Sequence, residues 1–278
     1  AREIRHSLWR CNHHSAYDGG GDDGEAGANR EKDVGKATWV KNLQIGIDLH
    51  ELEEIADNRM KTLFISCVGS HMWGMNSPES DIDLVMIYIA PTRSLLRGEK
   101  IMPTVRQQIT ARGGEIYDTL GWEIGHLINQ LIKGNVNAIW YVTSPLLVKP
   151  SILQEELSAL VRANLCRQTF HSIKGMAESQ IKSEEKPADK PGIAGKGYRT
   201  ALRTINFGIK LLLEGKICFA PVLSTPGKEA VMEKLQRLDE AYASSLLPDW
   251  PDEDVFRDFL MRQRLEDMVR AENIGIVK

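Results

Sequence analysis

The chain has 278 residues, of which 42% are hydrophobic and 26% are charged, and its formal net charge is −3. These values are near those of an average globular protein, and the length is sufficient to bury a core without disulfides or structural metal. The totals exclude a basic character spread over the whole chain, so any surface that binds nucleic acid must be local.

The cysteines Cys11, Cys67, Cys166 and Cys218 are widely separated in the sequence. Their spacing excludes a zinc ligand set and a disulfide scaffold, and we expect reduced thiols in a cytoplasmic protein. No apolar run approaches the roughly 20 residues of a membrane span, and no signal-peptide pattern is visible, so we expect no membrane partner.

Residues 1–37 are predicted to form a flexible N-terminal segment, because much of this stretch combines glycine with charged residues and offers little to bury. Within it, Cys11, His13 and His14 are of metal-binding types, but the absence of a second half argues against a metal site. Apolar residues then recur at helical spacing over residues 43–60, which predicts an amphipathic helix.

Residues 38–150 have the pattern of an α/β unit. Apolar, β-rich runs at residues 62–68 and 81–89 predict two strands, joined by a Gly/Ser loop and a short helix. A third strand is expected at residues 115–120, and from Trp122 onward the pattern is helical.

Residues 151–278 are predicted to be a helical region. Prolines and glycines within residues 182–197 predict a linker, after which helices are expected at 198–214, near 228–244 and at 254–272.

The segment that carries chemistry begins at Gly69-Ser70 and ends in Ser80-Asp81-Ile82-Asp83-Leu84. On a strand, Asp81 and Asp83 point to the same face, where two carboxylates are costly without a cation. Mg²⁺ commonly uses one or two carboxylates together with substrate phosphates. Gly69 lets the backbone approach a phosphate, and Ser70 at a helix N-terminus offers a hydroxyl and an N–H group. The alternative, exposed polar positions beside an ordinary turn, leaves the joint occurrence of these residues unexplained.

These residues resemble the GS…G…SDxDL signature of the DNA polymerase beta-like nucleotidyltransferase superfamily, and most closely the predicted nucleotidyltransferases with the pattern GSxxxG…P(D/E)SDxDL. The matching residues are Gly69, Ser70, Gly74, Pro78, Ser80, Asp81, Asp83 and Leu84. The resemblance implies an α/β (α+β) fold class, with a small mixed-sheet nucleotidyltransferase core and a C-terminal helical region. It also implies two-metal phosphoryl transfer with Mg²⁺ or Mn²⁺, in which a nucleoside monophosphate moves from an NTP to an acceptor.

Members of this superfamily normally supply a third carboxylate from a later strand. Asp118 is the best candidate, because the stretch that follows it, residues 127–135, resembles the family's helix ending in KGN. Glu115 and Glu123 remain possible, and strand-end capping is the alternative role for Asp118.

A phosphate clamp is predicted on the helix at residues 198–214. Arg199 and Arg203 are four residues apart and share a helical face, and Lys196 lies just before them. The segment loosely resembles the family's post-catalytic helix, although the usual residue after the tyrosine is missing. A solvated basic face is the alternative interpretation.

Three further side chains near the motif are weaker candidates. His71 follows Ser70 and either contacts substrate, caps the short helix or faces solvent. Trp73 and Trp122 have rings that can stack on a nucleobase, but core packing is the more frequent role.

The sequence predicts an active nucleotidyltransferase, with ATP as the leading NTP and RNA, a protein or a small molecule as the acceptor. The alternative is a nucleotide-binding regulatory or antitoxin-like interaction protein with little or no turnover. Absence of a third carboxylate would favour that alternative.

Overall fold

The computed structural model describes residues 60–110, 114, 116–185 and 195–275, with side chains up to residue 270. These residues belong to one compact unit, residues 45–278. The predicted flexible segment 1–37, the predicted helix 43–60 and Glu115 lie outside the described residues. In the described part of the chain, no helix is long and apolar enough to cross a membrane.

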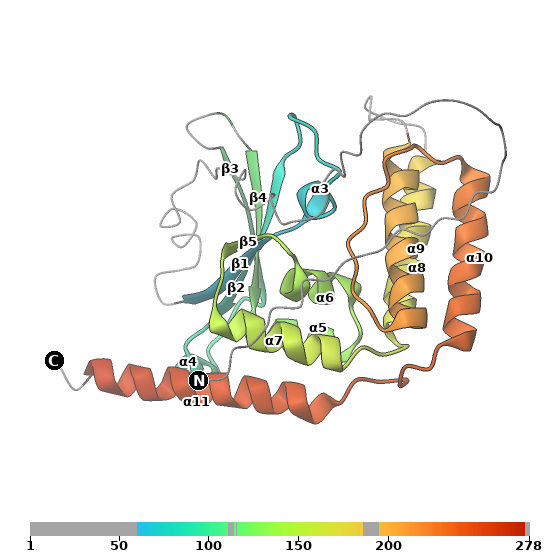
Figure 1. Ribbon diagram of the computed structural model, residues 1–278. Helices are drawn as coiled ribbons and strands as arrows, with labels where there is room; N and C mark the ends of the chain where they lie inside the picture. Colours follow the sequence, from blue (N-terminus) through green and yellow to red (C-terminus); the bar gives the residue numbers. More distant parts are fainter. Residues whose placement is uncertain (1–59, 111–113, 115, 186–194, 276–278) are drawn as a thin grey trace, which may run out of the picture. The chain divides into compact units, whose positions relative to one another are not determined.

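Five strands form one mixed sheet in the order β3-β4-β2-β1-β5 (Figure 1). They are β1 (Lys61–Cys67), β2 (Ile82–Ile89), β3 (Thr104–Thr110), β4 (Ile116–Glu123) and β5 (Leu147–Lys149). β2 and β4 are parallel, and the other neighbours are antiparallel. The predicted fold class, an α/β core with a mixed sheet and a C-terminal helical region, is confirmed.

The sheet differs from the sequence prediction at its edges. β3 and β5 were not predicted, since β3 is largely exposed and polar and β5 has three residues. β4 extends further than expected: Trp122 pairs with Thr104 in the strand, and the helix begins at Ile124. The prediction that the chain becomes helical at Trp122 is therefore wrong, because pairing with an unpredicted strand extends β4.

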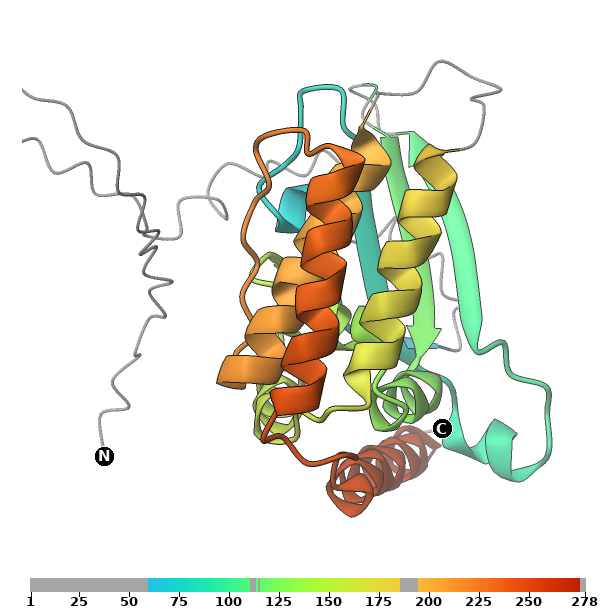
Figure 2. The ribbon, with the colours of Figure 1, turned by 90° about the vertical axis from the view of Figure 1, so that its right-hand side faces the viewer.

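The described residues contain nine helices, which divide into those on the sheet and those beyond it. They are α3 (Gly69–Met72), α4 (Thr92–Leu96), α5 (Ile124–Ile132), α6 (Val136–Thr143), α7 (Ile152–Ala163), α8 (Thr169–Glu184), α9 (Lys196–Glu214), α10 (Lys228–Ser244) and α11 (Glu253–Gly275). α5 and α6 lie against one face of the sheet, and α8, α9 and α10 run side by side (Figure 2). The main core lies between this sheet face and the helices.

Side-chain caps fix where several of these helices begin. The Asn135 side chain accepts a hydrogen bond from the Asn137 N–H at the start of α6, and the Ser151 hydroxyl accepts one from the Gln154 N–H at the start of α7. Such caps satisfy N–H groups that a helix leaves without a partner in its first turn.

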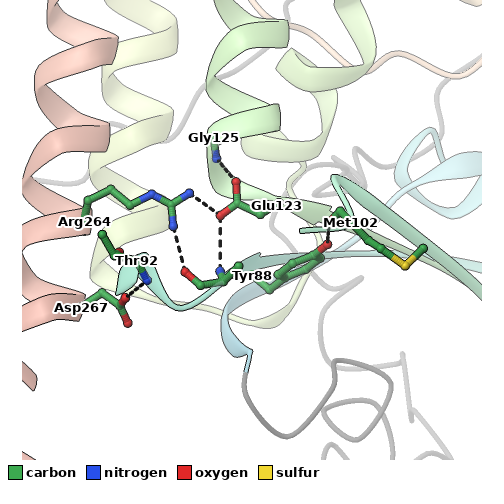
Figure 3. A network of polar contacts seen from close by, with 8 residues as sticks. Tyr88, Thr92, Met102, Glu123, Gly125, Arg264 and Asp267 are labelled. Carbon is green, nitrogen blue, oxygen red and sulfur yellow. Dashed lines mark hydrogen bonds and ion pairs between the residues drawn. The ribbon is translucent and has the colours of Figure 1, made fainter. Parts of the chain in front are cut away.

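A buried ion pair ties α11 to the sheet (Figure 3). Arg264 donates to the Glu123 carboxylate at 2.5 Å and to the Ala90 carbonyl oxygen at 2.9 Å. The same carboxylate accepts the Gly125 N–H at 2.7 Å, so it also caps α5. One carboxylate thus joins β4, α5 and α11, which makes Glu123 a structural residue.

Candidate active site

Two carboxylates lie side by side where β2 and β4 run parallel. Asp83 of β2 is in register with Asp118 of β4, so both side chains point to the same face of the sheet. By strand alternation this is also the face of Val85, which is buried in the main core beneath the helices. Asp81 is exposed and lies immediately before β2 rather than in it.

The charge environment of Asp83 brings five predicted or candidate residues together. Burial raises the pKa of Asp83, and the neighbouring charges of Asp118 and Asp81 raise it further, while His71 and Lys196 oppose the rise. All four therefore lie within electrostatic reach of this carboxylate. A cation among the three carboxylates would remove the repulsion that they now exert on one another.

Gly69 is required at its position for two reasons. Its φ is +61°, in the left-handed region, and a Cβ added to it would lie 1.7 Å from Oδ2 of Asp83. The Val68 N–H also donates to the Asp83 carbonyl oxygen at 2.8 Å. The Gly-Ser turn is thus packed directly against the carboxylate, as the motif interpretation requires.

The helix that begins at Gly69 is too short for Ser70 to gain much from a helix dipole. α3 has four residues, so its dipole contributes little to anion binding. Ser70 is partly exposed in the turn that packs against Asp83. Its hydroxyl and N–H remain its means of contacting a phosphate.

Arg203 is a cation that has no carboxylate partner among the residues that the structure describes. Its guanidinium lies 5.2 Å from the centre of the Trp73 ring, with Nη1 4.0 Å from the Met75 sulfur. Burial lowers its pKa to about 10, although the Asp83 charge acts in the opposite direction. No ion pair within 4.0 Å joins Arg203 to any acidic side chain that the structure describes. A half-buried cation in this state favours an anionic ligand.

Three buried nitrogen atoms near the motif lack hydrogen-bond partners among the described residues: Nε2 of His71, Nε of Arg199 and Nε of Arg203. Lys196, Arg199 and Arg203 are at i, i+3 and i+7 on α9, so they share one helical stripe. Native proteins leave few buried polar atoms without partners. The stripe and His71 therefore have the donors that a phosphate group needs.

The two tryptophans of the sequence analysis are packing residues. Trp73 is 2% exposed and makes edge-to-face contacts with Trp140, Phe207 and Phe219. These contacts join the turn after α3 to α9, and Trp73 has no surface left for a base. Trp122 is also buried, at 8% exposure.

The geometry favours Asp118 over Glu123 as the third carboxylate. Asp118 is partly exposed, 3.4 Å from the Gln108 amide nitrogen and 3.9 Å from the Arg106 guanidinium. Glu123 is five positions further along β4, on the opposite face, and is held by Arg264. Sequence reasoning missed Arg106 and Gln108 because it did not predict β3.

The acidic side chains suit a metal ion whose remaining coordination positions are filled by the substrate. Within the described ranges, no three His, Cys, Asp or Glu side chains form a ready-made metal site. Asp81, Asp83 and Asp118 offer oxygen donors, which suit Mg²⁺ or Mn²⁺ rather than zinc. Mg²⁺ commonly keeps only one or two carboxylates and fills its other positions with water and phosphate oxygens.

Comparison with known proteins decides the family. Residues 46–243, more than two thirds of the chain, match the family described as RlaP, the RNA repair pathway DNA polymerase beta family. The chain belongs to this family. The polymerase beta-like resemblance is thereby confirmed, and membership supports nucleotidyl transfer as the general activity.

Other likenesses are more distant. The chain is 24% identical over 124 residues to "Uncharacterized protein MJ0002" of Methanocaldococcus jannaschii, a match that covers 45% of the chain and half of that relative. A nucleotidyltransferase-like protein from Exiguobacterium sibiricum aligns at 11% identity and TM-score 0.28, over 69% of this chain and 72% of that one. Terminal uridylyl transferase 4 from Trypanosoma brucei, solved with UTP and UpU, aligns at 13% identity and TM-score 0.21, over 72% and 69%. TM-scores this low do not establish a shared fold.

Proposed function

We propose that this RlaP-family protein is a metal-dependent nucleotidyltransferase that moves a nucleoside monophosphate from an NTP to an acceptor hydroxyl. The observation that carries the proposal is the register of Asp83 with Asp118 beside the Gly69 turn. An absent third carboxylate would favour the interaction-protein alternative. The position of Asp118 next to Asp83 supports the enzyme instead.

Each part of the site has a role in this reaction. Asp81, Asp83 and Asp118 would hold Mg²⁺ or Mn²⁺ ions, which when bound supply charge neutralisation at the phosphates. Ser70 donates to the triphosphate from the turn. The α9 stripe of Arg199 and Arg203, with Lys196 at its exposed end, binds the β- and γ-phosphates.

The transfer needs only the NTP and the acceptor hydroxyl as reactants. A bond forms between the acceptor oxygen and the α-phosphorus, while the bond from that phosphorus to the bridging oxygen of the β-phosphate breaks. The hydroxyl proton passes to the Asp118 carboxylate and then to solvent, and pyrophosphate leaves with the electron pair. Asp118 is suited to this because it is partly exposed beside Asp83.

The acceptor that we propose is a hydroxyl group of RNA. The support is the family description, which places its members in RNA repair. ATP is the donor to test first, followed by GTP, CTP and UTP, because the residues that contact the phosphates do not select a base.

The test is transfer of α-phosphate label from each NTP to RNA, with Mg²⁺ or Mn²⁺ present and with chelator. Asp83→Asn should lower the rate by about a hundredfold or more, because it removes charge stabilisation at the reacting phosphate. Glu240→Gln is the matched control, since Glu240 is exposed on α10, which packs mainly on α9 and α8. Label transfer by Asp83→Asn equal to that of the control would contradict the metal assignment.

A further inference from the structure

A row of polar side chains crosses three strands and leads away from the carboxylates. Gln108 of β3 is in register with Asp118 of β4, which is in register with Asp83 of β2. Arg106 is two residues from Gln108 on β3, so it shares the same face. The edge of the sheet therefore continues the catalytic face as an exposed polar surface.

Arg106 can leave its ion pair with Asp118 and bind another anion. Its side chain is 77% exposed, and Nη2 lies 3.9 Å from Oδ2 of Asp118. An exposed pair at this distance contributes little to stability, so the guanidinium can leave it at small cost. Once a divalent cation neutralises Asp118, Arg106 has a positive charge at the site edge and no competing carboxylate in this row.

An aromatic side chain lies over the same face of the sheet, since it packs on Trp122, which is four residues from Asp118 on β4. Tyr141, at the end of α6, is half-buried and packs edge-on against Trp122, with ring centres 4.9 Å apart. The Ser66 hydroxyl donates to the Tyr141 carbonyl oxygen at 2.8 Å, which fixes the position of this residue. Burial raises the pKa of Tyr141 to about 12; the charge of Asp83 also raises it, while that of Arg106 lowers it. The phenol is thus within electrostatic reach of both residues.

We propose that Arg106, Gln108 and Tyr141 form the surface that binds the 3′ end of a single-stranded RNA acceptor, with Arg106 on the last phosphodiester and Tyr141 against the terminal nucleoside. Proteins bind single strands by combining basic side chains, which contact phosphates, with aromatic rings, on which bases stack. A polypeptide acceptor has no phosphate for Arg106. The inference rests on the proposed function, because it takes the 3′-hydroxyl of this RNA as the acceptor of the nucleoside monophosphate.

The test is RNA binding rather than turnover, measured by fluorescence anisotropy of a labelled single-stranded RNA with a free 3′-hydroxyl. The full chain is used, with Mg²⁺, without NTP, over a series of salt concentrations. Arg106→Ala should weaken binding about tenfold through loss of a charge-assisted contact. It should also make the slope of log K against log salt shallower by about 0.7, the value for one phosphate contact on a single strand.

Control variants separate a contact from a general charge effect. Arg237→Ala removes an exposed arginine that, like Arg106, is ion-paired to a carboxylate, here Glu233 on α10. It should leave the affinity and the slope as in the native protein. Arg106→Lys should keep the native slope, and Tyr141→Phe should bind more tightly than Tyr141→Leu, with thermal unfolding used to show that each variant is folded.

Two results would overturn the inference: an unchanged slope for Arg106→Ala, or label transfer by the native protein to a protein or small molecule while RNA is neither bound nor extended. In the second case nucleotidyl transfer itself survives. The proposed function fails separately, if the native protein binds RNA in an Arg106-dependent manner but transfers no label from any NTP. An RNA ending in a 3′-phosphate should bind through Arg106 and remain unextended.

Discussion

Replacing Gly69 with alanine tests the contact between the Gly-Ser turn and Asp83. The added Cβ would lie 1.7 Å from Oδ2 and 2.6 Å from Cγ of Asp83. Ordinary contact begins at 3.4 Å, so the carboxylate must retreat by about 1.7 Å. A displacement of about 1 Å at a reacting centre can cost a hundredfold in rate, so kcat/KM should fall by at least about that factor.

The same substitution has a backbone cost that must be subtracted. A non-glycine residue in the left-handed region costs about 1–2 kcal/mol. Gly98 has φ +75° with nothing within 4 Å of an added Cβ, and it follows α4 in the sequence. α4 lies at the end of the sheet opposite α3 (Figure 1). Gly98→Ala should therefore lower the melting temperature by about 2–8 °C and leave activity unchanged.

The measurement pairs thermal unfolding with label transfer for both variants. Gly69→Ala should lose at least as much stability as Gly98→Ala and, in addition, lose activity and Mg²⁺-dependent nucleotide binding. If Gly69→Ala keeps kcat/KM within threefold of Gly98→Ala, Asp83 does not need its observed position and the assignment of the site is wrong.

Three further predictions concern buried charges. The folded-state pKa of Asp83 is raised, so the folded protein holds this proton more tightly than the unfolded chain and loses stability as the pH rises through that pKa. Asp83→Asn should therefore stabilise the metal-free protein at neutral pH by about 0.5–2 kcal/mol, with the gain shrinking in acid, as thermal melts across pH will show. Arg264→Ala leaves the Glu123 charge buried and should cost about 3–5 kcal/mol in urea unfolding, whereas Arg257→Ala, at an exposed pair on the same helix, should cost about 0.5 kcal/mol or less. Arg203→Gln should weaken NTP binding about tenfold or more in isothermal titration without destabilising the protein, because it removes a half-buried cation that has no acidic partner in the described part of the chain; unchanged affinity would exclude Arg203 from the phosphate site.

The central part of the sheet was predictable because its signals are local. Buried strands of apolar residues predicted β1 and β2 to within one residue at each end, and helical periodicity predicted α9, α10 and α11. The Gly-Ser turn and the alternate carboxylates predicted a site for a divalent cation and a phosphate group, because the turn can bind the phosphate and the carboxylates can bind the cation. The family model that matches residues 46–243 agrees with the superfamily that these residues resemble.

What could not be predicted depends on pairing between distant residues. β3 is exposed along most of its length and has no apolar alternation, so only its register with β4 identifies it as a strand. Arg106 and Gln108 became visible as neighbours of Asp118 only through that register. Glu123 remained a candidate ligand for the same reason: its partner, Arg264, is 141 residues away in the sequence.

The two halves of the site carry opposite charges that do not neutralise each other, and these charges indicate the kind of ligand that the site binds. The carboxylates at the start of β2 and in β4 raise the pKa of Asp83, and α9 contributes Arg203, a half-buried cation with no acidic partner among the described residues. If the two groups simply neutralised each other, Arg203 would be ion-paired to Asp83, but its guanidinium instead contacts the Met75 sulfur and the Trp73 ring. A polyphosphate with divalent cations satisfies both groups, because the cations bind to the carboxylates and the phosphate oxygens accept from the arginine. Such a ligand explains why a site that costs stability when empty is built from two separate parts of the fold.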